Sequence, residues 1–301
     1  MASSTQDANR IIEERLDQYI RTLERYLNAY VLAFTGGIVS GVDDIFRDVV
    51  EEMRQRANTY RKLVVILTTH GGYIEVVQRI VEMLRYHYDY VDFIIPNYAY
   101  SAGTVLAMSG DSIYMNYYSR LGPIDPQLET APGKMVPALG YLIQWERLLD
   151  KAKNGELTTI EAQLMIDGFD QAELYQYEQA RELSIALLKE WLVKYKFKCW
   201  TVTETRRKPV THAMRAIRAS DIAKKLNNTE MWHSHGHGIS MEVLRRDLKL
   251  KIEDFDAQPS LGKKIDDYYN LLSDYMAKRR DTGVVHTKGL YVPFVWEDED
   301  A

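Results

Sequence analysis

The sequence has little cysteine and no long apolar run. Cys199 is the only cysteine among 301 residues, so an intrachain disulfide is excluded. No apolar stretch reaches the roughly 18 residues that a membrane-spanning helix needs, and the first residues lack the layout of a signal peptide. These absences predict a cytoplasmic protein without a membrane span.

The chain also lacks an excess of basic charge. Its 38 Lys and Arg stand against 43 Asp and Glu, a formal net charge of −5. Since nucleic-acid binding needs a basic surface, we expect no nucleic acid as the main partner. A basic cluster does occur at Lys196, Lys198, Arg206, Arg207 and Lys208. Its plain interpretation is a solvated surface, and a peptide- or nucleic-acid-binding patch is the alternative.

The central part of the chain alternates apolar strands with amphipathic helices. Strands are expected at 63–68, 90–96 and 111–116, and helices at 73–87 and 101–109. Strands that are apolar on both faces and alternate with helices indicate a parallel sheet covered on both sides. In such sheets ligands bind beyond the carboxyl ends of the strands, where Gly71, Gly72 and Ser101 fall.

The flanking segments are predicted to be mostly helical. Residues 1–9 are expected to be disordered, and Gly36-Gly37 is expected to end the first helix. We predict helices at 10–34, 42–60, 138–153, 157–167, 170–196, 213–226 and 265–279, with a short strand at 248–252. The apolar segment 290–296 is expected to dock on its own domain or on a neighbouring subunit.

Ser101 occupies a good position for a nucleophile. It follows an apolar run at 91–96 and precedes a small-residue run at 102–108, so a buried strand should turn into a helix there. Backbone N–H groups at a helix N-terminus are unpaired and stabilise a developing oxyanion. Gly71 and Gly72 let the backbone approach a ligand closely. The alternative is a helix-capping serine among small residues that serve packing.

Four motifs follow one another in this region: TTHGG at 68–72, YSAGT at 100–104, DSIYMN at 111–116 and LGPIDPQ at 121–127. Together they resemble the serine dehydrogenase proteinase family, which is related to signal peptide peptidase and to the Clp protease proteolytic subunit. A weaker echo lies at 232–239.

The resemblance implies an α/β fold of the ClpP/crotonase type, with stacked ββα units, a mostly parallel sheet, and helical elaborations at both ends. Residues 1–60 would form N-terminal helices that pack on the core or on a neighbouring subunit. Residues 61–260 would form the peptidase domain, and 261–301 a C-terminal helix and tail. A homo-oligomer is expected as well.

The resemblance also implies roles for single residues. Ser101 would attack a peptide carbonyl, and the backbone N–H groups of Gly72 and Ala102 would form the oxyanion hole. From their place beside Gly72, Gly71 and His70 are candidates for contact with substrate, and a structural or solvent-facing histidine is the alternative for His70. The implied function is a serine peptidase that cleaves extended or unfolded polypeptide and needs no cofactor.

The general base is left open by the sequence. Clp-type relatives carry a histidine in the loop where this chain has Ile124 and Asp125. His235, oriented by Asp125, would restore a Ser-His-Asp set from other chain positions. Lys151 or Lys153 would instead give the Ser-Lys dyad of signal-peptide-peptidase-like relatives, provided that the lysine is desolvated. The third alternative is that no functional base exists.

A metal site and two other functions are alternatives to the peptidase. His233, His235 and His237 occupy alternate positions, as three zinc ligands on one face of a strand would. Gly236 and Gly238 disfavour a regular strand there, so we expect no metal. A catalytically silent ring scaffold or partner-gated effector is the alternative function. Crotonase-type acyl-thioester chemistry is a third, which the hydroxyl at position 101 disfavours.

Overall fold

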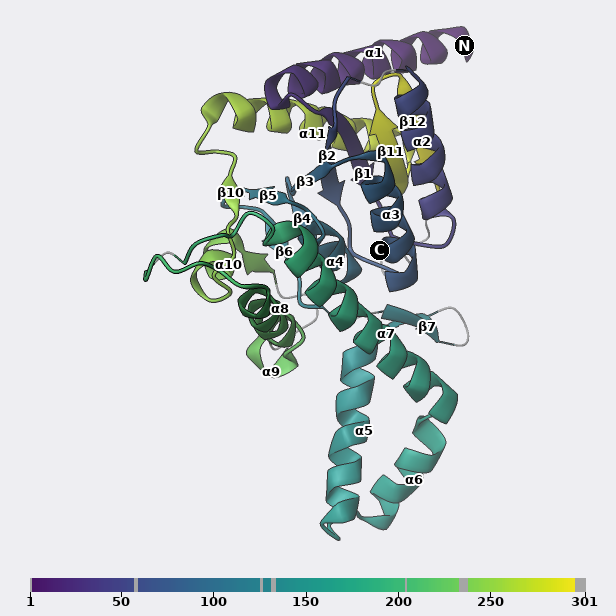
Figure 1. Cartoon of the computed structure of the whole chain (residues 1–301). Helices are drawn as coiled ribbons and strands as arrows, with labels where there is room; N and C mark the ends of the chain where they lie inside the picture. Colours follow the sequence, from purple (N-terminus) through teal and green to yellow (C-terminus); the bar gives the residue numbers. More distant parts are fainter. Residues whose placement is uncertain are drawn as a thin grey trace.

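The computed structural model describes residues 2–56, 59–124, 127–130, 134–203, 205–232 and 238–295. Its centre is a seven-stranded sheet in the order β10-β5-β3-β2-β1-β11-β12 (Figure 1). The strands are β1 (Tyr30–Thr35), β2 (Lys62–Thr68), β3 (Tyr90–Ile94), β5 (Ser112–Met115), β10 (Glu253–Asp254), β11 (Gly283–Thr287) and β12 (Leu290–Phe294). From β1 to β10 the neighbours are parallel, whereas β11 and β12 are antiparallel additions. The predicted α/β class with a mostly parallel sheet is confirmed.

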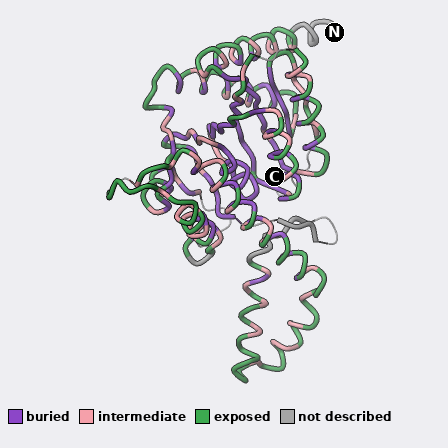
Figure 2. Tube along the Cα trace, in the orientation of Figure 1, coloured by how far each residue is buried: buried purple, intermediate pink, exposed green. Residues whose placement is uncertain are grey.

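Helices cover both faces of the sheet, and β2 shows why. Leu63, Val65 and Leu67 point into one apolar core, and Val64 and Ile66 point into the other. The first core lies under α2 (Val42–Arg56), α3 (Ile74–His87), α4 (Ala102–Met108) and α7 (Gln171–Trp191), and the second under α1 (Ala2–Leu27) and α11 (Pro259–Arg279). Buried residues accordingly concentrate along the sheet (Figure 2). A strand buried on both faces has no polar side, as the sequence predicts.

The N-terminal prediction is wrong in two respects. Residues 2–9 were expected to be disordered, but α1 begins at Ala2. The helix expected to reach residue 34 ends at Leu27, and Tyr30–Thr35 forms β1 beside β2. Asn28, with φ of 49°, breaks the helix, and the aromatic and β-branched residues that follow favour a strand. Their spacing also fits a helical repeat, which caused the error.

The C-terminal segment completes the sheet on its other side. The docking expected for 290–296 is confirmed for residues 290–294, since β12 pairs with β11 and β11 pairs with β1. Phe294 stacks on Phe34 with ring centres 6.0 Å apart. The short strand expected near 248–252 lies directly after it, as β10 at Glu253–Asp254, and α11 begins at Pro259 rather than near residue 265. No helix in the described ranges combines the length and the apolar character that a bilayer span requires.

Between Gly122 and β10 the chain forms a projecting helical hairpin and a smaller lobe. The hairpin of α5 (Ala138–Lys153), α6 (Thr159–Gly168) and the start of α7 extends away from the sheet (Figure 1). The remaining elements are β4 (Tyr98–Ala99), β6 (Arg120–Leu121), β7 (Gln127–Thr130), β8 (Lys134–Pro137), η1 (a π-helix, Leu192–Lys196), α8 (His212–Leu226), α9 (Thr229–Trp232), β9 (Ile239–Ser240) and α10 (Met241–Arg246). The short strands β4, β6 and β9 form a separate sheet, which carries the turn to α4.

A buried Tyr–His pair joins α11 to β11 and provides a test of this packing. The Tyr268 hydroxyl lies 2.7 Å from Nδ1 of His286, and both side chains are buried. Tyr268→Phe leaves that nitrogen without its partner, so we expect the free energy of unfolding to fall by about 1–3 kcal/mol in urea titration. The exposed Tyr86 serves as control, since Tyr86→Phe should change stability by less than about 0.5 kcal/mol. Equal stability of the two variants would contradict the packing described here.

Candidate active site

Ser101 lies at a strained turn between β4 and α4. Its φ and ψ are 51° and −119°, a region that residues other than glycine rarely adopt. Such a conformation costs about 1–3 kcal/mol and persists only when its surroundings enforce it. The residue is 1% exposed and precedes the first residue of α4, Ala102. The strand-to-helix turn expected from the sequence is therefore present, in a tighter form than an ordinary helix cap.

The end of β2 is held directly against this turn. The N–H of Thr69 donates to the carbonyl of Tyr98 (3.1 Å), and the N–H of Tyr100 donates to the carbonyl of Thr69 (3.0 Å). The chain then passes Ser101 at Gly71, whose φ is +110°. A Cβ on Gly71 would lie 2.9 Å from the Cβ of Ser101 and 2.9 Å from the Tyr100 carbonyl oxygen. Only glycine fits this contact.

Gly72 is fixed from its other side by the segment after β1. The N–H of Ile38 donates to the carbonyl of Gly71, and the N–H of Tyr73 donates to the carbonyl of Ile38, both at 2.8 Å. In a parallel bridge of this kind the intervening residue, Gly72, directs its own N–H and C=O away from Ile38. No described residue accepts a hydrogen bond from the Gly72 N–H. That amide remains available to a ligand.

A second amide is left over at the first turn of α4. Gly103 N–H donates to the Tyr100 carbonyl (2.8 Å) and Thr104 N–H to the Ser101 carbonyl (2.9 Å). The N–H of Ala102 has no acceptor within the described ranges. It also lies beside Gly71, because a Cβ built there would be 3.3 Å from the Ala102 nitrogen. Two backbone donors, from Gly72 and Ala102, thus flank Ser101.

Thr104 and Gly103 make this arrangement rigid. The buried Thr104 hydroxyl donates to the Ala99 carbonyl at 2.8 Å and accepts from the Gly122 N–H at 2.9 Å, which ties β4, α4 and the loop after β6 together. Gly103 lets α4 approach the end of β2, since a Cβ there would lie 2.3 Å from Cγ2 of Thr69. The sequence reasoning did not assign a role to Thr104.

An aromatic wall stands next to the turn. The Tyr98 hydroxyl lies 2.8 Å from Nε2 of the exposed His70, and the rings of Tyr98 and Tyr100 stack with centres 5.1 Å apart. Burial raises the pKa of Tyr100. His70 was singled out from the sequence, whereas the two tyrosines were missed. The alternation Tyr98-Ala99-Tyr100 was their available signal, because alternate residues of an extended segment share a face.

The residues suggested as general base meet different outcomes. Asp125 and His235 lie outside the described residues, as do His233 and His237. Lys151 is half exposed near the far end of α5, on the hairpin that extends away from the sheet (Figure 1). It forms an ion pair with Glu161, and this hydrogen bond helps lower the pKa of that carboxyl to about 2.

Lys153 is likewise engaged, 3.2 Å from Asp150. Both lysines belong to the last turn of α5, on the projecting hairpin, whereas Ser101 precedes α4 beside the sheet (Figure 1). The described residues contain no group of three or more His, Cys, Asp or Glu side chains that could hold a metal.

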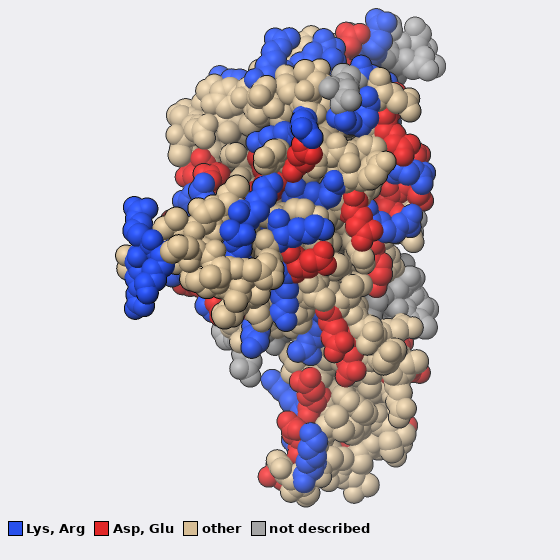
Figure 3. Space-filling view, viewed as in Figure 1, with Lys and Arg blue, Asp and Glu red and all other residues tan. Residues whose placement is uncertain are grey.

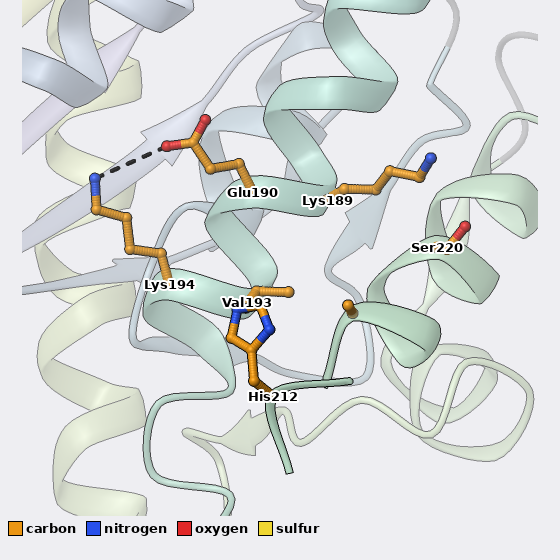
Figure 4. A pocket seen from close by; sticks show the side chains of 7 residues that line it. Lys189, Glu190, Val193, Lys194, His212 and Ser220 are labelled. Atoms are coloured by element: carbon orange, nitrogen blue, oxygen red, sulfur yellow. Dashed lines mark ion pairs between the residues drawn. The ribbon is translucent and has the colours of Figure 1, made fainter. Parts of the chain in front are cut away.

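Two cavities lie away from these loops. One, of about 660 Å³, is lined by residues of α7, η1 and α8, among them Glu190, Lys194 and His212 (Figure 4). The other, of about 810 Å³, lies at the amino-terminal ends of β2, β3 and β5. Neither is lined by Ser101, Gly71 or Gly72.

Comparison with known protein families matches residues 42–190 to the model described as ClpP-like SDH-type serine proteinase. Among curated proteins, the chain is 31% identical over 128 residues to Uncharacterized protein MJ0137 of Methanocaldococcus jannaschii, a match that covers 40% of this chain and 43% of that protein. It is 27% identical over 121 residues to Uncharacterized protein MJ1495 of the same organism, covering 39% and 38%. The chain thus spans about two fifths of the length of these curated relatives.

Among solved structures, two mutants of the 1510-N membrane-bound stomatin-specific protease are similar, each with a TM-score of 0.45 and 15% identity. One match covers 79% of this chain and 84% of that chain, and the other, a complex with a substrate peptide, covers 88% and 86%. ClpP1 from Listeria monocytogenes has a TM-score of 0.40 and 12% identity, with coverage of 75% and 93%. These likenesses concern the fold alone.

The contact between α4 and β2 can be tested by a compensating pair of substitutions. Gly103→Ala places a methyl group against Cγ2 of Thr69, and such overpacking costs about 1–3 kcal/mol. Thr69→Ser removes that methyl but keeps the hydroxyl that accepts from the Gly71 N–H. We expect the double variant to be more stable than Gly103→Ala alone in thermal unfolding. Additive losses would show that the two residues do not touch.

Proposed function

We propose that this chain is a serine peptidase that hydrolyses extended polypeptide with Ser101 as nucleophile, because residues 42–190 match the family model described as ClpP-like SDH-type serine proteinase. The observation that supports the proposal is the packing of Gly71 against Cβ of Ser101, next to two backbone amides, those of Gly72 and Ala102, without an acceptor among the described residues. A serine selected only for helix capping would need neither the strained turn nor the adjacent glycines.

The proposed reaction follows from these positions. Oγ of Ser101 attacks the carbonyl carbon of the scissile peptide, and a base takes the hydroxyl proton. The N–H groups of Gly72 and Ala102 donate to the carbonyl oxygen as it becomes negatively charged, and removal of one such donor typically costs roughly 10²–10³ in rate. The C–N bond then breaks, the proton passes to the departing amine, and water hydrolyses the acyl-enzyme.

Substrate would lie along the Gly71-Gly72 segment. The outward N–H and C=O of Gly72 offer an extended polypeptide a place to pair by backbone hydrogen bonds. His70, Tyr98 and Tyr100 would face one of its side chains. This arrangement selects chain conformation rather than one residue type, as expected for a peptidase of unfolded segments.

We propose His235, oriented by Asp125, as the general base. Lys151 is a weaker candidate because its ammonium is held by Glu161 at the start of α6. A lysine acts as a base only when it is desolvated and deprotonated, and an ion pair favours the protonated form. A cytoplasmic location stays a prediction.

Activity-based labelling of the purified chain tests the assignment. Ser101→Ala should abolish labelling by a fluorophosphonate probe, and with it the hydrolysis of casein. His235→Ala should lower peptide hydrolysis by roughly 10⁶-fold, as loss of a catalytic histidine does elsewhere. Lys151→Ala is the matched control and should retain activity.

Loss of activity in Lys151→Ala with full activity in His235→Ala would reverse the choice of base. If the wild type is neither labelled nor active, the peptidase proposal fails in favour of a catalytically silent ClpP-like scaffold or partner-gated effector.

We further propose that the chain forms a homo-oligomer through the projecting hairpin. Its helix α6 buries no residue within the chain, and Ile160 and Leu164 are 75% and 60% exposed. Residues four apart share a helix face, so these two side chains form an apolar surface without an intramolecular partner. Such surfaces on a projecting element mark interaction sites.

Changing both residues tests this surface. Ile160→Asp with Leu164→Asp should reduce the mass of the assembly measured by light scattering after gel filtration, because the interface would have to bury two carboxylates. Gln163→Glu adds charge to the same helix without removing apolar surface and should leave the mass unchanged. An unaltered mass in the double variant would exclude α6 from the interface.

A further inference from the structure

The cavity of about 810 Å³ lies at the edge of the sheet opposite Ser101. Lys62, Tyr90 and Ser112 line it, and they begin β2, β3 and β5. Gly71 follows the other end of β2, beyond Thr68, so the cavity and the serine are separated by about 20 Å of extended strand. The segment from Tyr195 to Trp200 forms another side of the cavity.

The lining of this cavity is strongly basic. Seven Lys or Arg side chains face it, against three Asp or Glu. Each carboxylate already has its own cation: Asp92 with Lys62 at 2.6 Å, Glu253 with Lys251 at 2.8 Å, and Asp111 with Lys198. Charge therefore remains uncompensated in a chain whose net charge is negative. Lys and Arg also gather over the centre of the face in Figure 3, and its projecting left tip is the segment between η1 and α8.

Four cations of the lining remain after these three pairs. Arg218 lies 2.7 Å from Asp221, which does not line the cavity, so three cations form the surplus. Lys196 and Lys249 have no ion pair with any described residue. Arg245 donates to the Ile252 carbonyl at 2.6 and 3.1 Å and likewise lacks a carboxylate partner within the described ranges. These groups come from two segments that are distant in the sequence: Lys196 ends η1, and Arg245 and Lys249 lie in and just after α10. Their convergence on one cavity is a property of the fold.

The positive charge of Lys196 lowers the stability of the folded chain. Burial lowers the pKa of its ammonium to about 8, against the opposing attraction of Asp92 and Glu253. Because this pKa is below that of a free lysine, the folded chain holds the proton less tightly than the unfolded chain, so the charge destabilises the fold at pH 7. A half-buried cation without an ion pair is a candidate for ligand binding.

Aromatic rings accompany the cations. Phe197 and Trp200 line the same cavity and contact each other edge to face, with centres 5.8 Å apart. The volume lies in the range of about 300–1,000 Å³ that is typical of small-molecule sites and exceeds what a lone phosphate would fill. An anion with an attached ring satisfies both parts of the lining.

We propose that this cavity is a nucleotide-binding site, in which Lys196, Arg245 and Lys249 hold the phosphate groups and the base packs on Trp200. Guanidinium and ammonium groups are the usual partners of phosphate, and each charge-assisted hydrogen bond is about twice as strong as a neutral one. The site is independent of Ser101 and needs no peptidase activity. The basic cluster that the sequence placed at 196–208 thereby divides, with Lys196 and Lys198 in the cavity and Arg206, Arg207 and Lys208 on an exposed tip.

Titration calorimetry on the full chain tests binding, with AMP, ATP, GTP and UTP as probes and adenosine and inorganic phosphate as comparisons. We expect at least one nucleotide to bind more than about tenfold more tightly than either comparison, since each of these satisfies only half of the lining. If no nucleotide binds at millimolar concentration, the proposal is wrong. Binding of an acidic peptide instead would assign the cavity to polypeptide and would overturn it as well.

Cys199 reports the place of binding. It is the only cysteine, it is exposed, and it lines the cavity. Its alkylation by iodoacetamide, followed by intact-protein mass, should slow about tenfold when a bound nucleotide covers it, in proportion to the fraction of chain left free. A nucleotide that binds without slowing alkylation lies elsewhere, and the assignment fails.

Two variants and a matched control complete the test. Lys196→Met should unfold at a higher temperature, because it removes the desolvated charge, and should weaken binding by about tenfold or more. The exposed Lys249→Met keeps the core intact and should also weaken binding. Lys194→Met is the control, since Lys194 is on the same π-helix but lies 3.8 Å from Glu190 in the other cavity (Figure 4). Equal affinity in all three variants would refute the site.

Discussion

The candidate site depends on one close backbone contact, between Gly71 at the end of β2 and the turn that carries Ser101. No side chain other than hydrogen fits there, because a Cβ would lie 2.9 Å from both the Ser101 side chain and the Tyr100 carbonyl. The hydrogen bonds of Thr69 with Tyr98 and Tyr100 hold the two segments at this separation. The strained conformation of Ser101 is stable because these contacts leave it no alternative. The position of Ser101 and its strained backbone conformation thus both result from the close approach of Gly71.

The central unit was predictable because its physical signals are local. The strand from Lys62 to Thr68 is apolar at nearly every position, and Ile74–His87 has a clear helical repeat, so both elements match the prediction within a residue. The glycines and the serine follow strand ends, where a parallel sheet gathers its ligands. The part of the site that the sequence predicted, Ser101 with Gly71 and Gly72, is therefore the part that short local motifs encode.

The remainder depends on contacts between distant segments. The role of Ile38 in orienting Gly72 was invisible because β1 was taken for the end of a helix, and its true state is set by pairing with β2 and β11. Thr104 and Tyr98 acquire their roles only through partners brought near by folding. The pairing of Lys151 with Glu161 across the α5–α6 turn could likewise not be read from spacing alone. Pairing of this kind overrides local propensity.

The place of β1 has a consequence for how the chain is made. Its edge opposite β2 is covered only by β11, more than 240 residues later, and Gly36 next to it packs on Gly283 and Phe294. Until the ribosome has released that distant hairpin, β1 presents an open edge that invites pairing with other nascent chains. The segment that holds Gly72 therefore gains its support last. The candidate site around Gly72 and Ser101 therefore cannot complete its fold before residues 283–294 have left the ribosome.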